Sequence, residues 1–204
     1  MYYSTLTFFL VLFVTIDGRR LSESKRQQSQ NNANTNNERY IKDTWNVYFR
    51  GQKVAGASAS SFTDLGYGYG KDTWGVYYYG KKIDGATVSS FQILQPYGGY
   101  GKDTWNVYFL ENKVQGATSS SFQSMGNAYG KDTWNVYFLG KKIDGASTSS
   151  FQILHPYGGY AKDTWNVYFL ENKVQGASSS SFQSLGNGYG KDTWSTYYQG
   201  KKIN

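Results

Sequence analysis

The chain has 204 residues, with 24 glycines, 2 prolines, no cysteine, 19% aromatic residues and a net charge of +7. The absence of cysteine excludes disulfide bonds and thiolate metal sites. Glycine at this density, among many Tyr, Trp, Phe, Val and Thr side chains, disfavours long helices and favours strands. Lysines and aspartates are mixed along the chain, so the sequence lacks the clustered basic patch of a nucleic-acid-binding protein, and we expect no nucleic-acid partner.

Residues 1–18 contain an apolar run from Leu6 to Ile16. This run has the length of the hydrophobic region of a secretory signal peptide and is short for a membrane span. We therefore expect residues 1–18 to be a signal peptide and the protein to be secreted. The alternative is an uncleaved signal anchor, which would be the only contact of the protein with a membrane. Residues 19–39 contain one large apolar residue, Leu21, and we expect a disordered polar linker because they cannot bury enough surface to offset the entropy of ordering.

Residues 40–204 consist of repeats. The string Lys-Asp-Thr-Trp begins at Lys42, Lys71, Lys102, Lys131, Lys162 and Lys191. The tryptophans are 29, 31, 29, 31 and 29 residues apart, so two forms alternate and the full repeat is a 60-residue pair. A regular period of this size indicates a tandem-repeat protein. We expect an all-β domain of tandem β-hairpins, with five full units and a terminal half unit, arranged as a solenoid or an elongated meander; closure into a β-propeller is the alternative.

The copy at Lys131–Ala161 has the pattern of a β-hairpin. Residues 133–138 alternate between apolar and more polar side chains, which predicts a strand. Gly140-Lys141 offers a tight turn, and residues 142–145 return as a second strand. In the other form of the repeat Glu111-Asn112 occupies this turn, and we expect Asn112 to take the left-handed conformation. A serine-rich turn and a short extended piece complete the unit.

The alternation predicts aromatic side chains on both faces of each hairpin. One face carries Trp, Val and Phe, and we expect its tryptophans to be structural core residues: Trp45, Trp74, Trp105, Trp134, Trp165 and Trp194. The other face carries tyrosines, a candidate ligand or assembly surface: Tyr48, Tyr77, Tyr108, Tyr137, Tyr168 and Tyr197. The alternative is that neighbouring copies cover this second face, which would bury the tyrosines with their hydroxyl groups hydrogen-bonded.

The recurring aspartates are the main candidates for chemistry: Asp43, Asp72, Asp103, Asp132, Asp163 and Asp192. All have the same local sequence, so an acid and a base are not differentiated, and an Asp before Thr-Trp favours a side chain that closes a turn on the backbone. The single histidine, His155, is replaced by Gln95 in the sister copy, which argues against a catalytic triad. We predict no catalytic residue, no cofactor and no metal site, and a protein that is not an enzyme.

The string Gly159–Gly186 joins a Lys-Asp start, an Asn-Val-Tyr-Phe strand and a Gly-Ala-Ser-Ser-Ser-Ser-Phe segment. In residue types and spacing it resembles the DKNYY repeat family, and the resemblance spans residues 40–204. The tryptophan of each copy, and the Ser or Thr after Gly-Ala, depart from the family pattern. The resemblance implies a β-rich repeat fold and assigns no functional residue.

The first and last copies look like internal ones, without polar caps. Repeat stacks without caps associate end to end. We therefore expect a non-catalytic structural protein that assembles with itself into extracellular fibres or a surface layer. The alternative is a glycan-binding or adhesion module that uses the ladder of tyrosines.

Overall fold

The computed structural model describes residues 39–95, 99–154 and 158–203. The predicted signal peptide, residues 19–38 of the predicted linker and His155 lie outside the described residues. The described chain divides into two compact units, residues 39–133 with 139–141 and residues 134–138 with 142–203, and each is described by itself. Within the described ranges no helix is long and apolar enough to span a lipid bilayer.

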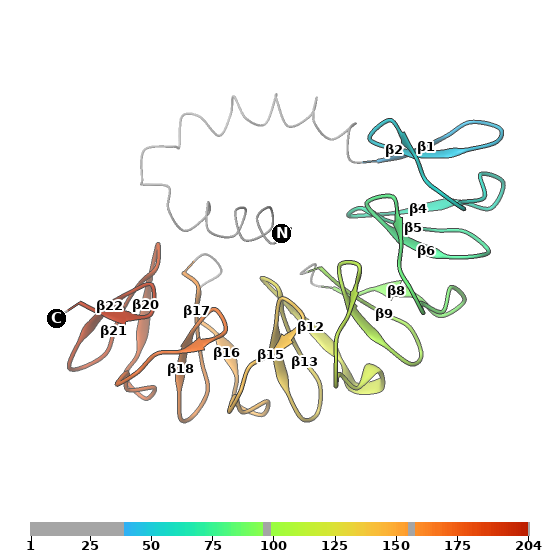
Figure 1. The fold of residues 1–204 in the computed structure, drawn as a ribbon. Helices are drawn as coiled ribbons and strands as arrows, with labels where there is room; N and C mark the ends of the chain where they lie inside the picture. The colour runs from blue at the N-terminus through green and yellow to red at the C-terminus, as the bar shows by residue number, and fades with distance from the viewer. Residues whose placement is uncertain (1–38, 96–98, 155–157, 204) are drawn as a thin grey trace. The chain divides into compact units, whose positions relative to one another are not determined.

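The fold is all-β, as predicted, and consists of short antiparallel sheets that follow one another along the chain (Figure 1). The sheets are β1-β2-β3, β4-β5-β6-β7, β8-β9-β10-β11, β12-β13-β14-β15, β16-β17-β18-β19 and β20-β21-β22-β23, each in sequence order. The strands are β1 (Tyr40–Lys42), β2 (Val47–Phe49), β3 (Gln52–Lys53), β4 (Thr63–Gly66), β5 (Tyr69–Lys71), β6 (Val76–Tyr78), β7 (Lys81–Lys82), β8 (Gln92–Ile93), β9 (Tyr100–Lys102), β10 (Val107–Phe109), β11 (Asn112–Lys113), β12 (Gln123–Gly126), β13 (Tyr129–Lys131), β14 (Val136–Phe138), β15 (Lys141–Lys142), β16 (Gln152–Ile153), β17 (Tyr160–Lys162), β18 (Val167–Phe169), β19 (Asn172–Lys173), β20 (Gln183–Gly186), β21 (Tyr189–Lys191), β22 (Thr196–Tyr198) and β23 (Lys201–Lys202). One 3₁₀ turn, η2 (Ser119–Ser121), is the only helical element of the described residues.

The sheet β4–β7 shows how the sequence builds a repeat. Two-residue turns join β4 to β5 and β6 to β7, and their residues have positive φ: 53° and 79° at Tyr67 and Gly68, 46° and 77° at Tyr79 and Gly80. Two successive residues with positive φ make the type I′ turn, whose twist matches that of the flanking strands. A four-residue turn, Asp72 to Gly75, joins β5 to β6 and is closed by a 3.0 Å hydrogen bond from the Asp72 N–H to the Gly75 carbonyl.

The predicted hairpin is confirmed, but its strands are shorter than predicted. The strand expected at residues 133–138 is β14, which begins only at Val136. The tight turn, predicted at Gly140-Lys141, lies one residue earlier, at Leu139 and Gly140, and the return strand expected at residues 142–145 is Lys141–Lys142. The prediction that Asn112 takes the left-handed conformation is wrong, because Leu110 has a φ of 56° and Asn112 lies in β11. Asn112 pairs with Phe109 across the hairpin, and this register leaves only residues 110 and 111 for the turn.

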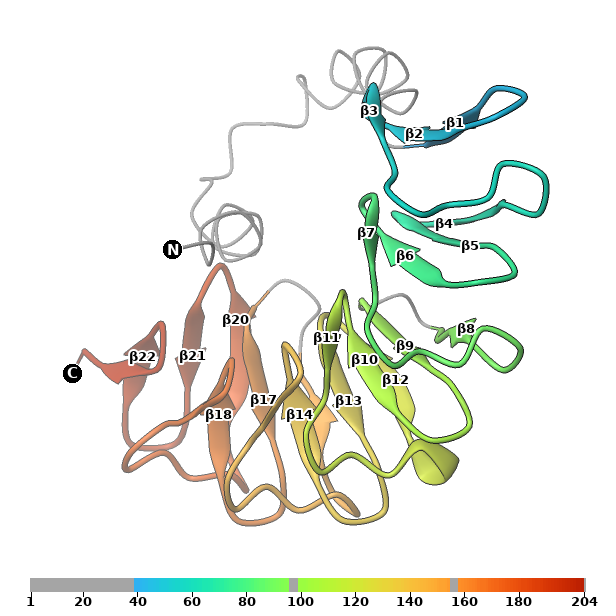
Figure 2. The same ribbon diagram turned by 45° about the vertical axis from the view of Figure 1, so that its right-hand side comes forward.

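Consecutive sheets of the first unit pack through aromatic side chains. Val47, Phe49 and Val54 of the first hairpin form a core with Phe62 of the loop that follows and with Tyr77 of the next repeat. The hydroxyl group of Tyr40 donates a hydrogen bond to the Gly68 carbonyl (3.1 Å) and accepts one from the Gly80 N–H (2.9 Å). Figures 1 and 2 both show the hairpin β1–β2 beside β4–β6.

The second unit repeats this arrangement. Tyr160, Val167 and Val174 pack with Phe182 of the loop that follows their sheet and with Tyr197 of the next repeat. The Gly200 N–H donates a 3.0 Å hydrogen bond to the Tyr160 hydroxyl group, as Gly80 does to Tyr40. Within each unit, a sheet therefore buries its aromatic residues against the sheet that follows.

Candidate functional site

The Lys-Asp-Thr-Trp string forms the four-residue turn of each sheet. In the repeat at Asp72, Oδ1 accepts hydrogen bonds from the backbone N–H groups of Trp74 (2.7 Å) and Gly75 (2.8 Å). The same pair of bonds holds the turns at Asp43, Asp103, Asp163 and Asp192. The predicted turn-closing role of the aspartate is confirmed at these turns, and the turn presents a fixed backbone at the tryptophan.

The second carboxylate oxygen connects the turn to the preceding loop. Asp103 Oδ2 accepts a hydrogen bond from the Thr87 N–H (2.7 Å) and lies 3.1 Å from the Tyr108 hydroxyl group. Burial raises the pKa of the Asp103 carboxyl group, but the hydrogen bonds from Thr87, Asn106, Trp105 and Tyr108 outweigh burial and bring the pKa below its usual value. Both oxygens are thus engaged within the protein, and the carboxylate is a structural centre of the turn.

The predicted tyrosine surface is wrong. The six tyrosines of this surface are Tyr48, Tyr77, Tyr108, Tyr137, Tyr168 and Tyr197. Five of them are at most 1% exposed, and Tyr48 is half-buried. Tyr77 shows the reason, because its ring packs at 5.6 Å from Phe62 of the preceding loop and its hydroxyl group lies 3.1 Å from both Asp72 Oδ2 and the Gly56 carbonyl. The alternative, that neighbouring copies bury these rings and satisfy their hydroxyl groups, is the arrangement observed. Burial, with the charge of the nearby Asp, raises the pKa of Tyr77 to about 12.

The predicted burial of the tryptophans is also wrong. Their exposed fractions are 82, 72, 76, 75, 78 and 83% for Trp45, Trp74, Trp105, Trp134, Trp165 and Trp194. Each tryptophan stands in the turn, outside the strand, so the in–out alternation begins only two residues later, at a valine or, in the last repeat, at Thr196. The Asp directly before Thr-Trp indicates this turn in the sequence, since its side chain accepts hydrogen bonds from the backbone N–H groups two and three residues later. We call the six side chains the tryptophan row.

The string lysines at 42, 71, 102 and 162 anchor the loop that follows their sheet. Lys42 Nζ donates hydrogen bonds to the carbonyl groups of Ala59 (3.1 Å) and Phe62 (3.2 Å). The equivalent lysines at 71, 102 and 162 bond carbonyl groups of their own following loops. These ammonium groups are therefore structural.

A second set of lysines, which the sequence analysis did not single out, lies beside the turns. It consists of the last residue of each two-residue strand: Lys53, Lys82, Lys113, Lys142, Lys173 and Lys202, here called the flanking lysines. Lys82 is opposite Tyr77 across the hairpin, and its Cε lies 2.7 Å from the position that a Cβ on Gly75 would occupy. Gly75 is the neighbour of Trp74, so the lysine stem runs next to the tryptophan turn. All six flanking lysines are exposed.

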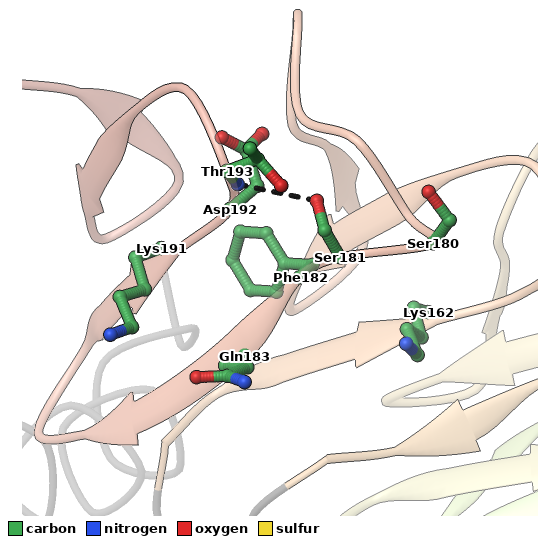
Figure 3. Close-up of a pocket in the computed structure, with 8 residues that line it drawn as sticks. All are labelled: Lys162, Ser180, Ser181, Phe182, Gln183, Lys191, Asp192 and Thr193. Carbon is green, nitrogen blue, oxygen red and sulfur yellow. Dashed lines mark hydrogen bonds between the residues drawn. The ribbon is translucent and has the colours of Figure 1, made fainter.

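The second unit contains an open pocket of about 560 Å³ beside the Trp194 turn. Lys162 and Lys191 lie on either side of Phe182 and Gln183, and hydroxyl groups of Ser180, Ser181 and Thr193 complete the lining with Asp192 (Figure 3). The Thr193 N–H donates a 3.2 Å hydrogen bond to Ser181 Oγ, which joins the pocket wall to the turn. The pocket offers hydroxyl, amide and ammonium groups, and the adjoining turn offers an indole ring.

Comparison with known proteins places these repeats in a family. No curated protein and no solved structure gives a significant match. The sequence profile described as the DKNYY family matches residues 40–172 and 100–204, two overlapping copies that together cover every tryptophan turn. The chain belongs to the DKNYY family.

Proposed function

We propose that this chain is a secreted, non-catalytic binding protein whose tryptophan row stacks on the sugar rings of a glycan. The observation that carries the proposal is the 72–83% exposure of six tryptophans, one per repeat, on turns whose backbone is held by an aspartate. Large apolar side chains placed singly on a surface need no explanation, but an exposed indole at the same position of every repeat is a regular feature that does. The apolar run at residues 1–18 supports secretion.

Indole stacking supplies enough free energy for such binding. A tryptophan exposes on the order of 200 Å² that a ligand can cover, and burial of apolar area contributes about 25 cal/mol per Å². Covering half of one indole therefore stabilises a complex by roughly 2–3 kcal/mol before the cost of association. One weak contact per repeat, multiplied along a polymer, gives useful avidity because later contacts form at high effective concentration.

The side chains next to the row favour a sugar over a purely apolar ligand. Half-buried Asn46, Asn106, Asn135 and Asn166 directly follow their tryptophans and carry neutral donor and acceptor groups. Such groups pair with sugar hydroxyls, while the indole face packs on the apolar face of a pyranose ring.

The test is glycan binding by the chain and by two matched double variants. Trp105→Ala with Trp165→Ala removes two indoles, and Thr104→Ala with Thr164→Ala changes the exposed neighbours in the same turns. On a glycan array and in polysaccharide pull-down, we expect the tryptophan variant to lose at least about tenfold in affinity and the threonine variant to bind as the parent does. Bound glycan should also shift the indole fluorescence to shorter wavelength. Equal binding by both variants, or no saccharide bound by the parent, would contradict the proposal.

Self-association is the second candidate function, and a specific observation favours it. Tyr69 and Tyr129 are 1% and 2% exposed, whereas Tyr189, at the same place in sheet β20–β23, is 45% exposed, and nearby Leu185 is 55% exposed. The Tyr69 hydroxyl group donates to the Gly99 carbonyl of the next sheet (3.0 Å). A second copy that packs a sheet on Tyr189 would extend the repeat, and repetition of this contact would produce fibres or a surface layer.

Sedimentation separates this second candidate from glycan binding. If copies associate through sheet β20–β23, Tyr189→Lys should convert oligomers to monomers, and Trp105→Ala should leave their size unchanged. A parent protein that sediments as a monomer at every concentration tested would rule the candidate out.

A further inference from the structure

We propose that the glycan is an acidic polysaccharide, whose carboxylate or sulfate groups are bound by the flanking lysines while its rings stack on the tryptophan row. This inference rests on the proposed glycan binding and names the class of ligand. It is carried by the repeated pairing of an exposed tryptophan with an exposed lysine on the adjoining strand.

The register holds each flanking lysine next to its turn. Lys53, Lys113, Lys173 and Lys202 are opposite the tyrosine of their hairpin, as Lys82 is. That tyrosine extends to the turn aspartate, for example with the Tyr108 hydroxyl group 3.1 Å from Asp103 Oδ2. Because directly opposed residues of an antiparallel pair project to the same face, the lysine stem follows the tyrosine toward the tryptophan turn. The contact of the Lys82 stem with the Gly75 position is the direct example.

The sequence retains these lysines selectively. The last position of the two-residue strand is lysine in all six repeats, whereas the position before it is Gln52, Lys81, Asn112, Lys141, Asn172 or Lys201. Both positions are exposed, so solubility alone would favour charge at either one. A requirement at one position only points to a directional role on the face that carries the tyrosine and the turn.

The flanking lysines are also available to a ligand. In the part of the chain that the structure describes, no ion pair or side-chain hydrogen bond engages any of these six ammonium groups, although Asp84 and Glu111 lie in the same hairpins or next to them. The string lysine and aspartate cancel in charge, and in repeats such as that of Lys102 and Asp103 both are held by internal hydrogen bonds. Each repeat therefore presents an exposed flanking lysine in addition to its exposed indole.

The pocket beside Trp194 adds a place where an acid group fits. Lys191 has no side-chain partner in the described residues, and Lys162 uses one hydrogen bond, to the Ser179 carbonyl at 3.0 Å. Asp192 faces the same pocket, but its carboxylate accepts hydrogen bonds from Ser178, Trp194 and Ser195. Two ammonium groups with the surrounding hydroxyl groups and the Gln183 amide suit one anionic group together with sugar hydroxyls (Figure 3).

A single-stranded nucleic acid also combines stacking with positive charge, but the charges here favour a glycan. Nucleic-acid grooves gather bases into a continuous positive track. In this chain the lysines come singly or in pairs, such as Lys81-Lys82, and acidic residues are interleaved with them along the repeats. An acidic polysaccharide, with one charge per sugar or fewer and many hydroxyl groups, matches this spacing of charges better.

The test compares one polysaccharide with and without its charge, using the mature chain. Three polymers are compared. Polygalacturonate carries carboxylates, the same polymer after chemical reduction of its carboxyl groups is neutral, and heparin carries sulfates. Lys82→Gln, Lys142→Gln and Lys202→Gln together should weaken binding to the acidic polymer about tenfold. Lys81→Gln, Lys141→Gln and Lys201→Gln together make the same charge change in the same hairpins and should weaken it by less than about twofold. Added salt should weaken binding by the parent and much less by the flanking-lysine variant.

The other possible results of this binding experiment separate the inference from the proposed function. Equal affinity for the acidic and the reduced polymer would overturn the inference and leave the proposed glycan binding intact. Binding to neither polymer nor heparin, nor to any glycan on the array, would overturn both. Equal losses in the two lysine variants, or tighter binding to an oligothymidylate than to any polysaccharide, would overturn the inference in favour of non-specific charge or of nucleic acid.

Discussion

The turn aspartate is the residue on which each repeat most depends. Asp103 is 3% exposed and accepts hydrogen bonds from three backbone N–H groups and from a tyrosine hydroxyl group. A buried donor that loses its acceptor destabilises the fold by its full desolvation free energy, which is larger than the net stabilisation from a typical hydrogen bond. The residue therefore joins the turn, the preceding loop and the buried tyrosine in one place.

Asp103→Ala should lower the free energy of unfolding by about 2–4 kcal/mol, because the Thr87 N–H and the Tyr108 hydroxyl group lose their carboxylate partner. Thr104→Ala, in the same turn, is exposed and should change it by less than about 0.5 kcal/mol. Urea denaturation followed by circular dichroism measures both. A loss below about 1 kcal/mol for Asp103→Ala would contradict the assigned role.

Stability should fall at both extremes of pH. Burial raises the pKa values of Asp103, Asp163 and Asp192, but backbone and tyrosine hydrogen bonds outweigh burial and hold them below the ordinary value in the folded state. These carboxylates therefore contribute fully to the stability of the fold above about pH 4. Their contribution to stability is lost as the pH falls through the folded-state pKa values. Burial, with the neighbouring aspartate, raises the pKa of Tyr108 and Tyr168 from 10.0 to about 12. The contribution of these two tyrosines to the stability of the fold is therefore full below about pH 10 and is lost as the pH rises toward about 12.

Calorimetric melting temperatures from pH 2 to 12 test this pH dependence. Tyr108→Phe should reduce the alkaline loss, because one buried hydroxyl group no longer ionises on unfolding. A melting temperature that stays constant from pH 10 to 12 would be inconsistent with buried tyrosines.

At the scale of the strand, glycine makes room for the aromatic ring of the preceding loop. A Cβ on Gly130 would lie 2.4 Å from Phe122 Cζ and 3.2 Å from Tyr100 Cε2, and a Cβ on Gly101 would lie 2.7 Å from Phe91 Cζ. Ala161 occupies, 60 residues later, the place of Gly101, and it is fully buried. One copy of this repeat form therefore already accommodates the extra methyl group.

Gly130→Ala should cost about 1–3 kcal/mol, since Phe122 is held between Tyr100 and the strand and cannot move away freely. Gly101→Ala should cost less than about 1 kcal/mol, because the same substitution is present at Ala161. Thermal unfolding of the two variants gives the comparison. Equal costs would show that the two repeat forms do not differ in this packing.

At the scale of the molecule, stability comes from contacts between successive repeats. Within each unit, the buried rings and loop hydrogen bonds join one sheet to the next. Stability in such an array is a sum of repeat and nearest-neighbour terms, so damage stays local.

Hydrogen exchange should therefore show a local effect of Gly130→Ala. We expect faster exchange in β12 and β13, with little change in β20–β22, measured by mass spectrometry of peptides. A uniform loss of protection along the chain would indicate one cooperative unit instead. Reducing agents should leave the exchange of the parent unchanged, since the chain has no cysteine.

The sequence by itself determined the all-β class, the 60-residue pairing of repeats, the presence of a glycine-containing tight turn in the Lys131 repeat and the turn-closing aspartate. These depend on local chemistry: the conformational freedom of glycine, the reach of an Asp side chain to nearby N–H groups, and the period of two along a strand. The strand Val136–Phe138 was predictable for this reason.

Only the tertiary structure decided which aromatic side chains are buried. Tyr77 is buried because Phe62 of the preceding loop and the Gly56 carbonyl meet it, and these partners come from another repeat. Trp74 is exposed because the Asp72 turn interrupts the strand, which shifts the start of the alternation to Val76. Periodicity assigns residues to the two faces of a strand, but the neighbours that cover a face are distant in sequence. For this reason the exposed aromatic side chains are those of the tryptophan row and not the tyrosines.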